Sequence, residues 1–172
     1  GHTSVIEHTS FTFAISDVSR SLTHQLVRHR IASYAQQSQR YVNLNELNYV
    51  TPPKIAKNKK MKKAYDQTMK DIWAQYNKLL DMEIPAEDAR FILPNGACTN
   101  IMVTMNARSL LNFFELRCCL HAQWEIRNLA NKMLSEVKKS RQLFLKMQDL
   151  HVRAKRCVLK IKKTVLFIQS EI

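Results

Sequence analysis

The chain has 172 residues, with 27 Lys and Arg against 14 Asp and Glu, and its formal net charge is +13. Its 45% hydrophobic and 24% charged residues are typical of a globular domain and exclude a wholly disordered chain. Its apolar runs are shorter than the roughly 20 residues that a membrane-spanning helix needs, which excludes a transmembrane protein of that kind.

The first part of the chain predicts a strand, a helix and a short second strand. Residues 8–15 alternate apolar and polar side chains, as strands do. From Asp17, which can cap a helix, apolar residues recur at every fourth position and predict a helix over about 17–30. This helix would carry the Arg-His-Arg sequence of residues 28–30 at its C-terminal end. Residues 31–42 predict a loop that runs into a short strand.

The rest of the chain predicts mainly helices. In chain order we expect a break at 51–53, a long amphipathic helix at about 55–82, a helical turn at 85–88, a turn at 94–96, a strand at 97–105, and helices at about 107–118 and 121–147. The predicted fold is therefore α+β, rich in helix, with a small antiparallel sheet.

Positive charge is concentrated in two segments. Residues 139–172 contain nine Lys or Arg against two carboxylates, and residues 54–63 read KIAKNKKMKK. Either segment can be a solvated face, or a binding surface for nucleic acid or another anion. Nucleic-acid modules often interleave aromatic and basic residues. The tail has only Phe144 and Phe167, so nucleic acid is not the partner that the sequence favours.

Arginines in two further segments are suited to binding phosphate. The chain has two glycines, too few for a Rossmann fingerprint or a Walker loop, so side chains would have to hold a nucleotide. Residues 28–40 combine three arginines with serines and glutamines. In residues 106–121, helical spacing places Asn106, Arg108 and Asn112 along one surface. An arginine in so apolar a helix needs a partner, either a ligand or a carboxylate such as Glu115 or Glu125.

The same segments resemble the flavin-dependent thymidylate synthases. Arg28-His29-Arg30, seven further residues, Ser38 and then Arg40 are similar to the signature of that family. Three more blocks resemble it in the same order: Gly1-His2-x-Ser4-x-x-Glu7-His8, Ala89-Arg90 ahead of Leu93-Pro94, and Asn106-Ala107-Arg108-Ser109-Leu110 through His121-Ala122-Gln123-Trp124-Glu125-Ile126. The resemblance covers roughly residues 1–138, and residues 139–172 form a basic tail of atypical sequence.

The resemblance implies a fold like that of these enzymes and the conversion of dUMP to dTMP. Methylenetetrahydrofolate would supply the carbon, FAD would relay the reducing equivalents, and NADPH would be the reductant. The family implies a cytoplasmic homotetramer with active sites shared between subunits and with no membrane partner. No metal is expected, because the four cysteines lack the spacing of metal ligands and are best interpreted as reduced thiols.

The resemblance also assigns residues to the ligands. For dUMP they are Gln25, Arg28, Gln36, Gln37, Ser38, Gln39, Arg40, Arg90 and Arg117. For FAD they are Ser4, Arg28, His29, Arg30, Gln36, Asn106, Ala107, Arg108, Asn112 and His121, with His2 nearby. Arg117 is the catalytic candidate, because a cation beside N3 and O2 of uracil stabilises the anionic pyrimidine. Ser38 as a nucleophile is the weaker idea, since neither His24 nor His29 has a compelling spacing to act as its base.

Two point changes and two larger departures from the family pattern qualify this interpretation. Gln36 stands where many members have glutamate, and Ala35 stands where many have asparagine. Separately, Glu7 can simply pair with an arginine. Members usually begin well before the block that opens this chain, so we expect an N-terminally truncated form. A shifted reading frame could give the tail a Phe-Lys-x-Ala-Gly-Pro stretch like that of family C-termini, so we expect a frameshift near residue 140. The alternatives are a catalytically impaired fragment and a basic nucleic-acid-binding module.

Overall fold

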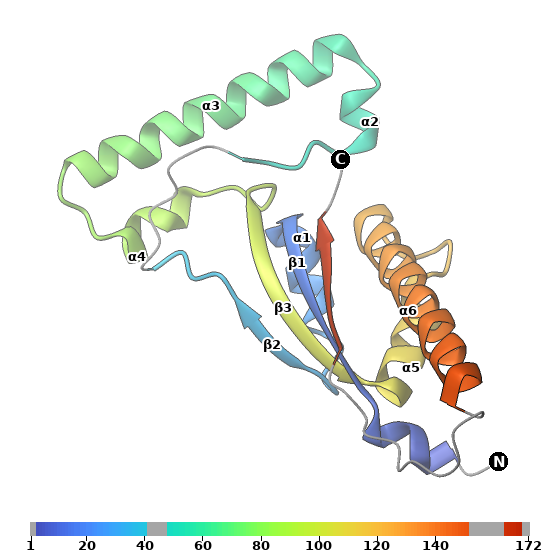
Figure 1. Ribbon diagram of the computed structural model, residues 1–172. Helices are drawn as coiled ribbons and strands as arrows, with labels where there is room; N and C mark the ends of the chain where they lie inside the picture. The colour runs from blue at the N-terminus through green and yellow to red at the C-terminus, as the bar shows by residue number, and fades with distance from the viewer. Residues whose placement is uncertain (1–2, 41–47, 152–163, 170–172) are drawn as a thin grey trace. The chain divides into compact units, whose positions relative to one another are not determined.

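The computed structural model of the protein describes residues 3–40, 48–151 and 164–169 (Figure 1). In chain order the elements are η1 (Thr3–His8), β1 (Ser10–Ser19), α1 (Arg20–Leu26), β2 (Ser33–Gln36), α2 (Pro53–Ala56), α3 (Lys59–Asp81), α4 (Ala86–Ala89), η2 (Arg90–Ile92), β3 (Cys98–Asn106), α5 (Ala107–Arg117), α6 (Trp124–His151) and β4 (Thr164–Gln169). Helices predominate over a small sheet, which confirms the predicted α+β class.

The strands form one sheet in the order β2-β3-β1-β4. β1, β2 and β3 are antiparallel, and the arrows of β1 and β3 point in opposite directions in Figure 1. The hydroxyls of Thr12 and Thr104 lie 2.9 Å apart across the β1–β3 pair. Along β3, buried residues such as Ile101 and Val103 alternate with more exposed ones. This period of two confirms the strand predicted at 97–105.

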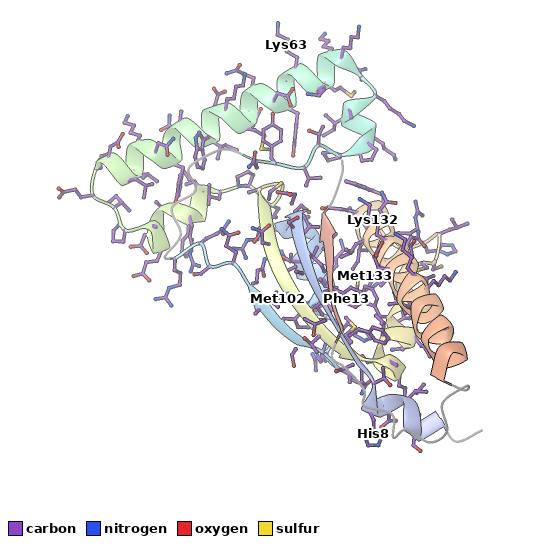
Figure 2. All side chains as sticks on the ribbon, viewed as in Figure 1. His8, Phe13, Lys63, Met102, Lys132 and Met133 are labelled. Carbon is purple, nitrogen blue, oxygen red and sulfur yellow. The ribbon has the colours of Figure 1, made fainter. Side chains whose placement is uncertain are left out.

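By the contacts among its residues, the chain divides into two compact units. Unit 1 is Gly1–Ala14, Arg28–Tyr34 and Met102–Ile168; unit 2 is Ile15–Val27, Ala35–Ile101 and Gln169–Ile172. In unit 1, α5 packs against α6 and η1. Its buried apolar residues include Phe13 and Met133 (Figure 2). In unit 2, α2, α4 and η2 each contact α3, and Leu22, Leu26 and Tyr76 are fully buried. The boundary expected between residues 138 and 139 stays a prediction.

The first helix differs from its prediction at both ends. It begins at Arg20 rather than at about 17, because Ser19 is the N-cap and its Oγ accepts a hydrogen bond from the Leu22 amide at 3.0 Å. Asp17 does not cap the helix; it belongs to β1 and has a left-handed φ of 57°. The helix ends at Leu26, so residues 28–30 follow it instead of forming its last turn. Those three residues belong to unit 1, while α1 belongs to unit 2.

The long helix predicted at 55–82 consists of two helices, α2 and α3. Asn58 separates them: its φ of −115° is not helical, and its Oδ1 accepts hydrogen bonds from the amides of Lys60 and Met61. The prediction missed this cap because Asn58 lies within a lysine-rich run that reads as continuous helix. The apolar side is confirmed, since Met69 and Tyr76 are buried two turns apart.

A Schellman motif ends α3. The amide of Ile84 donates to the carbonyl of Leu79 at 3.1 Å, and that of Glu83 donates to Leu80 at 2.9 Å. Glu83 therefore occupies the position just after the cap with a φ of 61°, where glycine is the usual residue. Pro85 is the N-cap of α4 rather than its first helical residue.

The turn at 94–96 and the two later helices are also confirmed. The amide of Ala97 donates to the carbonyl of Pro94 at 2.9 Å. Helix α5 ends one residue before its predicted C-terminus, and α6 begins three residues after its predicted N-terminus. Differences of this size are usual at helix ends, because the terminal turns fray.

Candidate active site

Nearly all of the residues that the resemblance assigns to FAD lie in unit 1. They are Ser4, Arg28, His29, Arg30, Asn106, Ala107, Arg108, Asn112 and His121. All of these except His29 are half-buried or exposed. Guanidinium and amide groups are the donors that hold a diphosphate in the absence of a glycine-rich loop, so this set fits the diphosphate of a flavin dinucleotide. His2 lies outside the described residues.

The N-terminus of α5 organises part of this set. Asn106 is the N-cap, and its Oδ1 accepts a hydrogen bond from the amide of Ser109 at 2.8 Å. Arg108, in the first turn, forms an ion pair with Glu7 of η1. The partner that the sequence left open for this arginine is thus Glu7, and not Glu115 or Glu125. Both side chains are largely exposed, so the pair adds little stability.

His29 connects the Arg-His-Arg segment to α5 from a buried position. Its Nε2 lies 2.7 Å from the Oγ of Ser109, and that hydroxyl donates to the carbonyl of Ile31 at 2.5 Å. Because the hydroxyl proton is used in this way, the imidazole must donate its Nε2–H to the serine oxygen. Burial lowers the pKa of His29, an effect that the hydrogen bond to Ser109 opposes and the charge of Arg117 reinforces. His29 is therefore a neutral, buried anchor for its exposed neighbours Arg28 and Arg30.

Arg117, the catalytic candidate, lies at the C-terminal end of α5 and is half-buried. Its positive charge acts on two neighbours in unit 1, His29 and Tyr34, and lowers the pKa of each. Burial nevertheless raises the pKa of Tyr34 to about 12, and its hydroxyl donates to the carbonyl of His29 at 2.7 Å. Arg117 forms no ion pair among the residues that the structure describes. A cation in this position is available to an anionic ligand.

Most of the residues assigned to dUMP lie in unit 2. They are Gln25, Gln36, Gln37, Ser38, Gln39, Arg40 and Arg90, while Arg28 and Arg117 belong to unit 1. The side-chain amide of Gln36 donates to the hydroxyl of Thr23 at 3.0 Å. Gln37 is bound to Asn100 twice: its amide N–H donates to the Asn100 carbonyl and its Oε1 accepts from the Asn100 side chain, each at 2.9 Å. These bonds fix the polar segment that follows β2.

Glu87 links the two arginines that are predicted to bind the phosphate of dUMP. Arg40 donates to its Oε2 from Nε and Nη2, at 3.1 and 2.8 Å. Arg90 donates from Nε to its backbone carbonyl at 2.9 Å. Ser38 accepts a hydrogen bond from the amide of Arg40 at 3.1 Å, which gives the segment a tight turn. The structure thus brings Ser38, Arg40 and Arg90 to one place.

Arg20 is a further candidate for the site, and the sequence analysis did not single it out. Its Nη2 donates to the carbonyl of Gln37 at 3.2 Å, while its Nε is buried without a partner among the described residues. Burial and then the charge of Arg90 lower the pKa of Arg20. Neither guanidinium forms an ion pair with a described carboxylate. Two arginines in this arrangement repel each other unless an anion lies between them.

One signal in the sequence could have identified Arg20. It is the first residue of a helix, where a cation opposes the helix dipole and a carboxylate is preferred. The amide of Arg20 also donates to the carbonyl of Ala97, and that of Ser21 to the carbonyl of Asn95. These two bonds tie the start of α1 to the turn at 94–97. The interpretation of residues 17–30 as one continuous helix concealed the position of Arg20.

The described residues include histidines, cysteines and carboxylates, which are the usual metal ligands. Among them, no group of three or more His, Cys, Asp or Glu is placed to hold a metal ion. Cys98, Cys118 and Cys119 form no disulfide among the described residues, and the Sγ of Cys119 lies 3.5 Å from Nδ1 of His121. Hydrogen bonds from the backbone and side chain of His121 lower the pKa of Cys119. None of the helices in the described part of the chain combines the length and apolar character needed to cross a membrane.

Comparison with known proteins gives a consistent result. Residues 1–140 match the family model described as "Thymidylate synthase complementing protein". Three similar curated proteins carry the name "Flavin-dependent thymidylate synthase". That of Clostridium tetani is 54% identical over 155 aligned residues, and the match covers 81% of this chain and 62% of that protein. That of Nitratidesulfovibrio vulgaris is 55% identical over 142 residues (78% and 58%), and that of Geobacter sulfurreducens is 54% identical over 140 residues (80% and 60%).

The chain therefore spans about three fifths of the length of these relatives. The family model covers most of this chain, including both arginine-rich segments and the turn that carries Arg90. The chain belongs to the thymidylate synthase complementing protein family.

Proposed function

We propose that this chain acts as a flavin-dependent thymidylate synthase, which methylates dUMP reductively to dTMP. The shared name of its relatives supports this activity. The structural observation that carries the proposal is the pair formed by Arg20 and Arg90. Arg20 has a buried Nε without a partner among the described residues, and burial and then the charge of Arg90 lower its pKa, so a bound nucleotide phosphate would offset both effects.

In the proposed reaction, methylenetetrahydrofolate would give its one-carbon unit to C5 of the pyrimidine and leave as tetrahydrofolate, C5 would lose its proton, and the hydride would come from FAD that NADPH has reduced. Arg20 and Arg90 would bind the phosphate, and the hydrogen-bonded Gln37 would keep the neighbouring backbone in place. Arg117 would lie beside N3 and O2 of uracil, where its charge stabilises the electron-rich ring that C5 attack requires. No cysteine is given a role as nucleophile.

The flavin would be held by the residues of unit 1. Arg28, Arg30 and Arg108 supply guanidinium donors, and Asn106 supplies an amide at the start of α5. His29 acts indirectly in this proposal: as a buried anchor on Ser109 it fixes the segment that carries Arg28 and Arg30. A homotetramer and a cytoplasmic location belong to the same proposal, because the resemblance implies both.

The test combines ligand binding with turnover. Purified protein should bind FAD and show its absorption spectrum, bind dUMP, and release tritium from C5-labelled dUMP when the carbon donor and NADPH are present. Arg117→Ala should abolish tritium release and retain most of the FAD binding. Arg127→Ala is the matched control, because Arg127 is also a half-buried arginine of unit 1 and donates to the Leu120 carbonyl. Unchanged turnover in Arg117→Ala would refute the role of that residue.

A second candidate is a chain that binds dUMP and FAD without turnover. The ion pair between Arg40 and Glu87 favours it, because it occupies one of the predicted phosphate ligands with a carboxylate of the chain itself. Binding of both ligands without tritium release at any protein concentration would establish this candidate and exclude catalysis. Light scattering in the same samples would give the oligomeric state on which a shared site depends.

A further inference from the structure

The lysines of residues 54–63 form a cluster that the proposed activity does not use. They lie on α2 and on the first turns of α3, and all of them are exposed: Lys54, Lys57, Lys59, Lys60, Lys62 and Lys63. Lys63 extends outward from this end of α3 in Figure 2. We call these six residues the lysine cluster. It belongs to unit 2 alone.

The cluster carries almost no compensating negative charge. Lys62 pairs with Asp66 at 2.6 Å, and the other five lysines form no ion pair with a described carboxylate. The first turn of α3 contains no acidic residue, and its N-cap is the neutral Asn58. Hydrogen bonds from Lys62 and then Tyr49 lower the pKa of Asp66, and its two carboxylate oxygens already accept hydrogen bonds from these two residues. The net charge of the cluster is therefore strongly positive.

This placement of lysines works against the stability of the helix. Cations at a helix N-terminus oppose the positive end of the helix dipole. Lys59 and Lys63 are four positions apart on one face, where like charges repel. Apart from the Lys62–Asp66 pair, no described carboxylate compensates these charges by an ion pair, and a local arrangement that conflicts with folding is typical of a functional surface. An external polyanion would relieve both kinds of repulsion.

We propose that the lysine cluster is a docking surface for the phosphate backbone of duplex nucleic acid. Lysine binds phosphate as a point charge without reading bases, so binding should be independent of sequence. Single strands are not the favoured partner, because their binding sites use aromatic platforms and residues 53–63 contain no aromatic residue. The lysine cluster shares no residue with the proposed phosphate site at Arg20 and Arg90, and its ligand would be much larger than dUMP.

The test compares two double variants of the full chain that remove the same charge. Lys59→Gln/Lys63→Gln removes two members of the cluster, and Lys70→Gln/Lys78→Gln removes two exposed lysines from the remainder of α3. Affinity for a duplex DNA of 30 base pairs is measured by fluorescence anisotropy over a series of salt concentrations. The cluster variant should bind roughly tenfold more weakly at 0.1 M salt, and the slope of log K against log salt should fall by about 0.9 for each lysine. The control should bind like the parent.

Two further measurements distinguish a binding surface from a structural effect. The cluster variant should melt at a higher temperature than the parent, because the repulsion at the start of α3 is removed. Weaker DNA binding together with a lower melting temperature would mean that the helix was damaged, which contradicts the proposal. Equal DNA affinity in both double variants would overturn it, because the basic tail or general charge would then account for binding. If the cluster variant lost the parent's binding to phosphatidylserine vesicles while its DNA affinity stayed unchanged, the proposal would be overturned in favour of a lipid surface. None of these outcomes depends on dUMP, FAD or turnover.

Discussion

Replacement of Arg20 by methionine tests the proposed phosphate site most directly. Methionine keeps an unbranched apolar stem and removes the guanidinium, together with its buried Nε and its hydrogen bond to the Gln37 carbonyl. It also relieves the electrostatic repulsion from Arg90. We therefore expect a large loss of dUMP binding and a much smaller change in the stability of the ligand-free protein.

The two magnitudes follow from the contacts. A hydrogen bond to a charged group contributes about 1.5–3 kcal/mol, so Arg20→Met should weaken dUMP binding by roughly 10- to 150-fold. In the free protein, the lost bond to the Gln37 carbonyl also involves the charged guanidinium and costs about 1.5–3 kcal/mol. Removal of the unpartnered Nε and of the repulsion from Arg90 acts in the opposite direction. The free energy of unfolding should therefore fall by less than the cost of that bond.

Calorimetric titration with dUMP and with deoxyuridine separates a phosphate contact from a general defect. Arg20→Met should lower the affinity for dUMP and leave that for deoxyuridine unchanged, because only dUMP carries a phosphate. Arg127→Met is the matched control, since that guanidinium also donates to a backbone carbonyl, of Leu120, at 2.8 Å. An equal loss of affinity for both ligands, or no loss for dUMP, would refute the reasoning.

Two further predictions concern stability. Glu83→Gly should raise the melting temperature by about 2–4 °C, because glycine adopts the left-handed φ of 61° without steric cost; Glu83→Ala, which lacks this freedom, should give no gain in calorimetry. Burial lowers the pKa of His29, so below about 6.5 the unfolded chain binds more protons than the folded chain, and stability falls as the pH decreases. In His29→Gln, denaturant titrations between pH 5 and 8 should show a smaller decrease in the free energy of unfolding as the pH falls. An unchanged decrease would mean that another group takes up the protons.

Periodic features of the sequence predicted most of the elements. The period of two in β3 and the apolar side of α3 give unambiguous patterns, and both are confirmed. The ends of elements were less predictable, because they depend on which of several capping residues is used. Ser19 and Asp17 can both cap a helix, and Asp17 instead takes a left-handed conformation within β1. Asn58 was overlooked for a similar reason, since lysines on both sides of it favour helix.

In the candidate site, too, some features could be predicted from the sequence and others could not. The resemblance assigned residue types to ligands, and it did not indicate their partners within the chain. Arg108 pairs with a carboxylate 101 positions away, and Arg40 pairs with Glu87, 47 positions away. Neither partner follows from local spacing. Arg20 was not identified because residues 17–30 were interpreted as one helix, and because the burial of its Nε and the effect of Arg90 on its pKa are tertiary properties.

The use of glycine in this chain supports the assignment of phosphate binding to arginines. The chain has two glycines, and the one within the described residues, Gly96, serves packing. A Cβ at Gly96 would lie 2.6 Å from the hydroxyl of Tyr65, which donates to the Val50 carbonyl at 3.0 Å. Gly96 therefore lets α3 approach the turn before β3, and its backbone does not form a phosphate loop. A phosphate that cannot be held by glycine-lined amides requires cationic side chains, and Arg20 and Arg90 are two arginines of unit 2 that form no ion pair with a described carboxylate.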